Sequence, residues 1–217
     1  MKRRDFSLTA AAAVVAPGLM GVRVASAQAP KPREGKDYLV LDKRAPADAP
    51  AGKIEVIEFF WYSCPHCYAF EPMLEAWIKA APKDVTVKRV PVGFREDFGP
   101  QQRMYYTLEA LGKADELHGK FFKAIHSERL PLSTDDAIIA WAEKQGLDKA
   151  KFTEVYRSFS VASKVRRAIQ LQDAYKVEGV PALGIAGRYY TDGSLAGSME
   201  RALSVTDFLI AEVRKSK

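Results

Sequence analysis

The chain has 217 residues, and its 33 basic and 27 acidic residues give a formal charge of +6 at neutral pH. Its 47% of hydrophobic residues is ordinary for a globular protein, and the sequence has no internal repeat or low-complexity segment, which excludes a repeat architecture. Four basic residues and one acidic residue lie within the first 27 positions, so the remainder carries only +3. Such a mild charge without a concentrated basic face argues against nucleic-acid binding.

The N-terminus has the three parts of an export signal. Residues 2–4 are basic, residues 8–20 form an Ala-rich apolar run, and Ala25-Ser26-Ala27 is a small-residue cleavage site. The apolar run is too short to span a bilayer and is interrupted by a Pro-Gly pair. We therefore expect residues 1–27 to be a signal peptide cleaved near Ala27, exported by the general or the twin-arginine route. The mature protein is expected in an oxidising compartment, where disulfides persist.

The next segment predicts a βαβ unit. After a polar leader with a short edge strand at 38–41, residues 53–60 are rich in β-branched and aromatic side chains, as in a buried strand. Apolar residues recur at helical spacing over 65–80, and residues 85–90 form a second strand. Both cysteines of the chain therefore lie where a strand leads into a helix.

Between residues 95 and 177 the pattern changes to that of successive helices. Glycines and capping residues mark where several of them begin and end. Five helices are expected: 101–111 ending at Gly112, one around 117–125, one capped by Ser133 and ending at Gly146, one that begins at Asp148, and one at 161–177.

Strand character returns near the C-terminus. The expected elements are strands 182–185 and 188–190, a hairpin turn at Ala186-Gly187, and an amphipathic helix at 205–214 capped by Ser204 or Thr206. The fold class is therefore α/β, with an all-helical domain inserted into a small α/β domain. The expected parts are 28–94 and 178–217 for the α/β domain and 95–177 for the helical insertion.

The pair Cys64-Pro-His-Cys67 has three common interpretations. A zinc site needs about four ligands, but the chain has only two cysteines and three histidines, and His66 cannot easily bind the same metal as its neighbours. A structural disulfide is most useful when it closes a long loop, whereas this one would span two residues. A redox-active dithiol fits best, because at a strand-to-helix junction it can open and close without moving the fold.

The beginning of the helix would make Cys64 acidic. Cys64 occupies the capping position and Pro65 the first turn, where its missing N–H costs nothing. A Cys64 thiolate can accept from the free N–H groups of His66 and Cys67, and the helix dipole and the His66 side chain add positive potential. Cys67, one turn further in, keeps an ordinary or raised pKa and serves as the resolving thiol. Because a stabilised thiolate favours the reduced protein, the disulfide would be a strong oxidant.

Glu58-Phe-Phe, Cys64-Pro-His-Cys-Tyr68, Gly179-Val-Pro-Ala182 and the helical insertion stand together in one chain. From about Lys36 to the C-terminus it resembles the DsbA family of bacterial periplasmic thiol:disulfide oxidoreductases. The resemblance implies a thioredoxin fold with an inserted all-helical domain, Cys64 as nucleophile, and no bound cofactor. It also implies a periplasmic location and reoxidation by a quinone-linked membrane oxidase resembling DsbB. Residues 61–63 and much of the insertion depart from the family pattern, which leaves substrate range open.

The resemblance further implies that Pro181 follows a cis peptide bond. Val180-Pro181 lies at the start of a strand that a thioredoxin topology brings against the cysteines. A cis bond there would expose the Val180 backbone beside Cys64, where an extended substrate segment could pair with it as an added strand. The alternative that the residues alone leave open is an ordinary trans proline at a strand start.

Glu58 is an acidic residue within an apolar strand, and Lys88 of the next strand is its candidate neighbour. The resemblance matches these positions to an acid and a lysine beneath the active site. A buried Glu58 would have a raised pKa and could transfer a proton to Cys67. Alternatively, both side chains point to solvent or simply pair. We interpret His118 and His126 as surface or satisfied core residues.

We therefore expect a dithiol oxidase that donates the Cys64–Cys67 disulfide to newly exported unfolded proteins, acts as a monomer and binds no metal. A disulfide isomerase or reductase of the same fold is the first alternative. Known soluble isomerases, however, carry an upstream dimerisation domain, and only about 25 residues separate the expected cleavage site from the first main strand here. A non-catalytic holdase with a merely structural disulfide is the second alternative, and replacing Cys64 by Ser would leave its activity intact.

Overall fold

The structure, a computed structural model, describes residues 30–216. The expected signal peptide and its cleavage site therefore lie outside the described residues. From Pro32 onward the chain forms a single folded unit. Within the described range no helix is both long enough and apolar enough to cross a bilayer.

A five-stranded mixed sheet lies at the centre of this unit, in the order β1-β5-β4-β2-β3. β2 runs parallel to β3, as the crossover through a helix requires, and β4 runs antiparallel to β5, as a hairpin requires; β2 and β4 also pair antiparallel. The expected strands are confirmed, except that Arg188 belongs to the hairpin turn and the last strand extends to Asp192. The strands are β1 (Leu39–Val40), β2 (Ile54–Phe60), β3 (Val85–Pro91), β4 (Ala182–Ile185) and β5 (Tyr189–Asp192).

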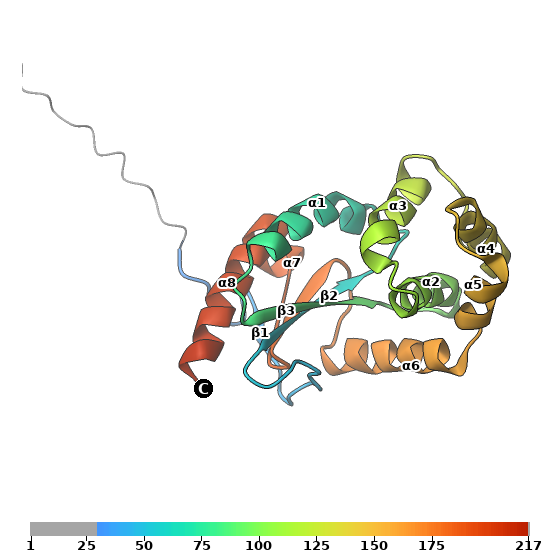
Figure 1. Cartoon of the computed structure of the whole chain (residues 1–217). Helices are drawn as coiled ribbons and strands as arrows, with labels where there is room; N and C mark the ends of the chain where they lie inside the picture. The colour runs from blue at the N-terminus through green and yellow to red at the C-terminus, as the bar shows by residue number, and fades with distance from the viewer. Residues whose placement is uncertain (1–29, 217) are drawn as a thin grey trace, which may run out of the picture. The chain divides into compact units, whose positions relative to one another are not determined.

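The helices between β3 and β4 form the helical insert that the sequence predicts. Figure 1 shows α2–α6 gathered at one side of the unit, with α1 and α8 packed side by side at the other. The helices are α1 (Pro65–Ala80), α2 (Gly99–Ala110), α3 (Ala114–His126), α4 (Asp135–Lys144), α5 (Lys149–Tyr156), α6 (Phe159–Ala174), α7 (Gly193–Ala196) and α8 (Met199–Lys215), with a 3₁₀ turn, η1 (Glu96–Phe98), before α2.

Two predicted helix starts are wrong. Thr134, not Ser133, caps α4 by accepting from the N–H of Ala137. The last helix begins six residues earlier than expected, because Ser198 accepts from the N–H of Arg201 and starts the helix there, ahead of Ser204. The short helix α7, capped by Asp192, has no apolar periodicity and was not expected.

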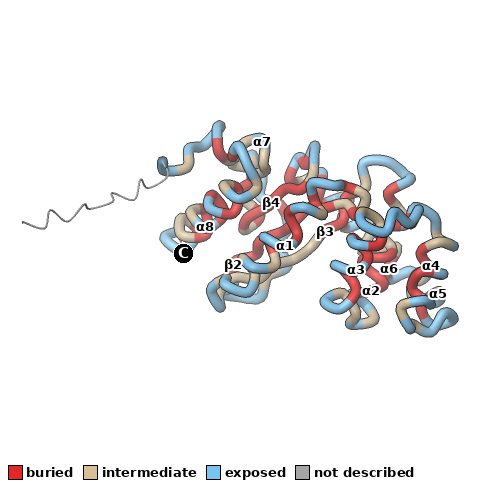
Figure 2. The backbone as a smooth tube through the Cα atoms, turned by 90° about the horizontal axis from the view of Figure 1, so that it is seen from above, coloured by how far each residue is buried: buried red, intermediate tan, exposed pale blue. Residues whose placement is uncertain are grey.

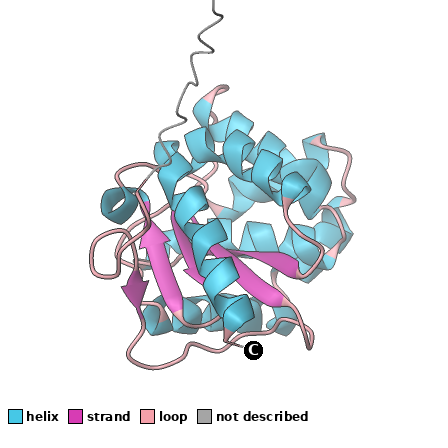
Figure 3. Ribbon diagram, turned by 90° about the vertical axis from the view of Figure 1, so that its left-hand side faces the viewer, coloured by secondary structure: helices cyan, strands magenta, loops and turns pink. Residues whose placement is uncertain are grey.

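Each face of the sheet packs against its own hydrophobic cluster. Ile54 and Val56 of β2 pack with side chains of α1 and α8 on one face. Ile57 and Phe59 belong to a larger cluster that includes both cysteines and residues of α2–α6. Helices lie on both faces of the strands (Figure 3), and buried positions run through the middle of the unit while the connecting loops are exposed (Figure 2).

Gly184 in β4 leaves room for a buried tyrosine. The ring of Tyr175 packs at 5.3 Å from the ring of Phe59, and its hydroxyl accepts from the N–H of Gly187 at 2.9 Å. A Cβ at position 184 would overlap the Tyr175 ring. The contact between α6 and the hairpin therefore depends on a residue without a side chain.

We predict that Gly184→Ala lowers the free energy of unfolding by about 1–3 kcal/mol, because it overpacks the site of Tyr175. The same substitution at Gly119, in α3 with no atom near the added methyl group, should raise it by about 0.5–1 kcal/mol through helix propensity. Chemical denaturation of both variants measures the two effects. Equal effects at the two positions would contradict this account of the packing.

Candidate active site

The two cysteines lie at the junction between the end of β2 and the beginning of α1. A turn follows the strand, closed by the N–H of Cys64, which donates to the carbonyl of Trp61 at 3.0 Å. Cys64 then caps α1 with extended backbone angles, and the N–H of Cys67 donates to its sulfur at 3.4 Å. Pro65 opens the helix, as the sequence predicts. The expected capping position of Cys64 is thus confirmed.

The two thiols have opposite acidities. The pKa of Cys64 is lowered to about 6, mainly by the hydrogen bond from the Cys67 thiol, then by the backbone N–H groups of Cys67 and His66 and by the charge of His66, against the opposing effect of burial. The pKa of Cys67 is raised far above its ordinary value, chiefly because the residue is fully buried. Sequence reasoning identified the N–H donors but missed the larger contribution of the second thiol.

Val180 and Pro181 lie against Cys64. Their peptide bond is cis, as the family resemblance implies. The Cys64 thiol donates to the Val180 carbonyl at 3.4 Å, although the two residues are 116 positions apart in the chain. A hollow of about 310 Å³ opens beside them, and its lining includes His66, Val180, Pro181 and Met199. Backbone and cavity are therefore both accessible next to the reactive sulfur.

Glu58 is completely buried, but its partner is not Lys88. The sheet register pairs Glu58 with Arg89 and Ile57 with Lys88. Successive residues of a strand point to opposite faces, so Lys88 lies on the other face, where it binds Asp48 at 2.7 Å. The expectation that Lys88 lies beside Glu58 is therefore wrong, and the neighbour of Glu58 is the next residue of the strand, Arg89.

Arg89 instead joins three carboxylates below the cysteines. Its guanidinium binds Glu58 at 3.1 Å and Glu71 at 2.8 Å, and it also pairs with Glu75. Burial, reinforced by the charge of Glu71, raises the pKa of Glu58 to about 8 despite the opposing charge of Arg89. Glu58 is therefore largely protonated at neutral pH, and a negative charge on it would raise the pKa of Cys67 further.

Both histidines of α3 lie close to the motif. His118 is a buried core residue, as one of the two expected alternatives has it, but only its Nδ1 is hydrogen-bonded, to Tyr62; its Nε2 lies 3.5 Å from Glu71 without a hydrogen bond. His126 is partly buried and donates to the carbonyl of Tyr62 at 2.8 Å. The sequence signal for this arrangement is their spacing of eight residues, which places both on one face of a helix. Sequence reasoning did not connect them to the cysteines.

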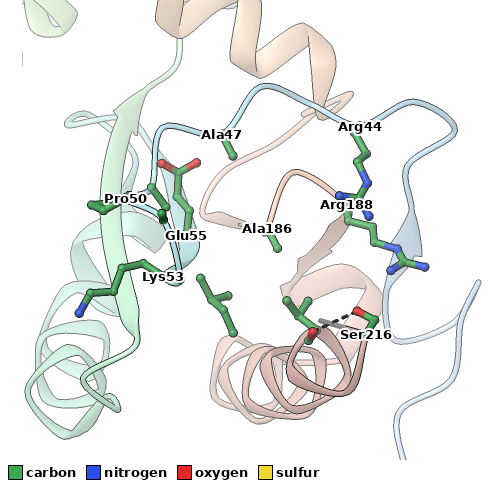
Figure 4. A pocket seen from close by; sticks show the side chains of 13 residues that line it. Arg44, Ala47, Pro50, Lys53, Glu55, Ala186, Arg188 and Ser216 are labelled. Atoms are coloured by element: carbon green, nitrogen blue, oxygen red, sulfur yellow. Dashed lines mark hydrogen bonds between the residues drawn. The ribbon is translucent and has the colours of Figure 1, made fainter.

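A second hollow, of about 320 Å³, lies at the other end of the sheet. Figure 4 shows Arg44, Lys53, Glu55 and Arg188 around it. Its lining includes the first residue of β2, whereas the cysteines follow the last. Seven strand residues span about 20 Å, so this hollow is remote from the dithiol.

Comparisons with known proteins agree with this site. Residues 100–203 match the family described as DSBA-like thioredoxin domain. The thiol:disulfide interchange protein DsbA of Bordetella parapertussis is 47% identical over 209 residues, which cover 96% of each chain. The protein of the same name from Pseudomonas aeruginosa PAO1 is 38% identical over 97% of each chain.

Solved structures of such proteins have the same fold. The crystal structure of Pseudomonas aeruginosa DsbA matches with a TM-score of 0.79 and 39% identity, over 84% of this chain and 94% of that one. The crystal structure of the oxidoreductase DsbA from Xylella fastidiosa also gives a TM-score of 0.79, with 30% identity over 85% and 98% of the two chains. With such relatives along nearly its whole length, and with a Cys-x-x-Cys pair that caps a helix in the same fold, the chain belongs to the DsbA family of thiol:disulfide interchange proteins.

Proposed function

We propose that this thiol:disulfide oxidoreductase works in the periplasm as an oxidase of newly exported, unfolded proteins. Members of the family use the cysteine pair itself and no bound cofactor. Cys64 is the nucleophile of the pair and Cys67 the resolving thiol. A quinone-linked membrane oxidase resembling DsbB restores the disulfide. The family's periplasmic location and the export signal at 1–27 support this compartment.

The low pKa of Cys64 is the observation that carries the proposed direction of electron flow. At a pKa of about 6, roughly nine tenths of this thiol is ionised at neutral pH. Stabilising the thiolate stabilises the reduced protein relative to its disulfide, so the disulfide readily takes electrons from substrate thiols. A reductase needs the opposite balance. The same observation argues against a merely structural disulfide, the basis of the holdase alternative.

The reaction then proceeds in two exchanges. A substrate thiolate attacks the Cys64 sulfur, forming a mixed disulfide and expelling Cys67 as a thiolate, which takes up a proton because its pKa is high. A second substrate thiolate attacks the substrate sulfur of the mixed disulfide and expels Cys64 as a stabilised thiolate. Two electrons pass from the substrate to the enzyme, and the substrate leaves with a disulfide.

Glu58 supplies the proton that Cys67 takes up. The carboxyl is buried with its Oε1 atom free of hydrogen-bond partners, and its pKa of about 8 keeps it protonated at neutral pH. Its electrostatic effect on Cys67 supports a transfer between the two. Arg89 stabilises the carboxylate that remains, at 3.1 Å.

The backbone at Val180 holds the substrate. Its carbonyl already accepts from Cys64, so a bound segment extended along Val180 and Pro181 would lie next to the attacked sulfur. Backbone pairing of this kind is independent of side-chain identity, which suits an enzyme that acts on many unfolded chains. The adjacent hollow of about 310 Å³ can receive one substrate side chain.

We predict that the reduced protein shows a thiolate transition near pH 6 in ultraviolet absorbance, which Cys64→Ser abolishes. Because the pKa in the folded state lies below that of the unfolded chain, the thiolate stabilises the reduced protein fully at alkaline pH. This contribution is lost as the pH falls through about 6. Cys67→Ala should raise the transition, since it removes the largest stabilising hydrogen bond, but leave it below the ordinary thiol value of about 8.5. A transition of the unmodified protein at about 8 or higher would refute the oxidase assignment.

The direct test is the oxidation, by the disulfide form of the enzyme, of a reduced, unfolded protein that contains two thiols. The oxidised enzyme is expected to convert one equivalent of substrate stoichiometrically, whereas Cys64→Ser is inactive. The Cys67→Ala variant can form a mixed disulfide between Cys64 and the substrate but cannot resolve it with Cys67. When the substrate has no second thiol, this mixed disulfide should therefore break down more slowly than that of the unmodified protein. Faster reshuffling of scrambled disulfides than oxidation of thiols would instead favour the isomerase alternative.

We predict that Glu58→Gln slows the reaction of the oxidised enzyme with a dithiol at neutral pH by roughly tenfold or more, because Gln cannot donate the proton. In the unmodified protein the rate should fall as the pH rises through about 8, and the variant should lack this transition. Stopped-flow fluorescence measures both. Glu55→Gln is the matched control, since Glu55 is also a buried acid of β2 but lies three residues away and on the other face. An unchanged pH profile in Glu58→Gln would exclude the proton role.

A further inference from the structure

The turn that presents Cys64 is held from outside its own domain. Tyr62 and Ser63 are the central residues of this turn, which the bond from the Cys64 N–H to the Trp61 carbonyl closes. The hydroxyl of Ser63 accepts from the side chain of Gln101 in α2 at 2.7 Å. Tyr62 is held from α3. Both central residues are therefore fixed by the helical insert, although neither takes part in thiol chemistry.

Two histidines on one face of α3 hold Tyr62 at opposite ends. His118 and His126 are eight residues apart, about two helical turns, and Phe122 lies between them on the same face. The Tyr62 hydroxyl lies 2.8 Å from Nδ1 of His118, and Nε2 of His126 donates to the Tyr62 carbonyl at 2.8 Å. The ring of Tyr62 is fully buried and packs at 4.9 Å from that of Phe122.

The surroundings of His118 define the direction of its hydrogen bond. Its Nε2 faces the carboxylate of Glu71 at 3.5 Å, so the ring hydrogen resides on Nε2 and Nδ1 accepts from the Tyr62 hydroxyl. Burial lowers the pKa of His118 and raises that of Tyr62, which keeps both groups neutral at physiological pH. Tyr62 thus donates through its hydroxyl and accepts through its carbonyl.

The same helix also holds the chain after the motif. Tyr68 directly follows Cys67, and its ring stacks on that of His126 at 4.9 Å with an angle of 8° between the planes. Its hydroxyl lies 2.8 Å from that of Ser127, at the end of α3. His126 therefore contacts one residue before and one residue after the cysteine pair.

We propose that His118 and His126 are positioning residues for the dithiol, which fix the turn at Tyr62 and thereby the sulfur of Cys64. The hydrogen bonds that stabilise its thiolate are short-ranged: the one from the Cys67 N–H spans 3.4 Å, and the His66 N–H and the Cys67 thiol supply the others. A turn that moves by a fraction of an ångström weakens them, because hydrogen bonds lose strength steeply with distance and angle. This role deepens the proposed oxidase function and rests on it.

His126 offers a matched pair of variants. His126→Gln keeps an amide N–H donor at about the position of Nε2, whereas His126→Leu removes the donor and leaves the Tyr62 carbonyl unpaired. We expect His126→Leu to raise the pKa of Cys64 by about half a unit, equivalent to about a threefold shift of the glutathione equilibrium towards the disulfide. His126→Gln should restore most of both values.

Tyr62→Phe tests the hydrogen bond between Tyr62 and His118 without disturbing the packing of the ring. It removes only the hydroxyl bound to His118, so we expect a folded protein with a smaller shift in the same direction. Phe121→Leu is the packing control, because Phe121 contacts the Tyr62 ring at 4.6 Å but makes no hydrogen bond to the turn. It should lower stability and leave the pKa of Cys64 and the glutathione equilibrium unchanged.

The outcomes separate this inference from the function on which it depends. If Tyr62→Phe and His126→Leu lose stability as Phe121→Leu does, yet keep the parent's thiol pKa and glutathione equilibrium, the histidines are merely structural and the inference is overturned. An ordinary thiol pKa in the unmodified protein would instead refute the oxidase function itself. A rise in His126→Leu that His126→Gln reverses supports the positioning role.

Discussion

The chemistry of this protein depends on one hydrogen-bonding arrangement, in which the sulfur atom of Cys64 caps the N-terminus of helix α1. Helix α1 begins with N–H groups that no carbonyl of the helix can satisfy, and Cys64 stands where a serine or aspartate would ordinarily cap them. A thiolate satisfies those donors better than a disulfide sulfur does. The fold therefore stabilises the reduced state, and the disulfide becomes the reactive form.

The difference between the two cysteines follows from the same geometry. Cys64 lies at the positive end of the helix, beside the exposed His66, whereas Cys67 is one turn further in and completely buried. Burial that opposes ionisation of Cys67 also raises the pKa of Glu58 beneath it. The same burial thus keeps both the Glu58 carboxyl and the Cys67 thiol largely protonated at neutral pH, and Arg89 lies 3.1 Å from the carboxyl.

The helical insert supports the site as well as covering the sheet. The cysteines belong to the same hydrophobic cluster as the inward side chains of α2–α6. From these helices come Gln101, which binds Ser63, and the two histidines that bind Tyr62. The α/β domain supplies the strand-to-helix junction, and the insert holds the turn within it. The α/β domain and the helical insert therefore both contribute to the position of the Cys64 sulfur.

The sequence by itself determined the features that depend on local order. Helix α1, the strands on either side of it and the capping position of Cys64 follow from residue spacing, and the family resemblance supplied the fold and the cis bond before Pro181. Only the tertiary structure decided which side chains meet. A shift of one residue in a strand exchanges faces, so Arg89 rather than Lys88 reaches Glu58. The contact of His126 with Tyr62 joins residues 64 positions apart, and packing, not local order, brings such residues together.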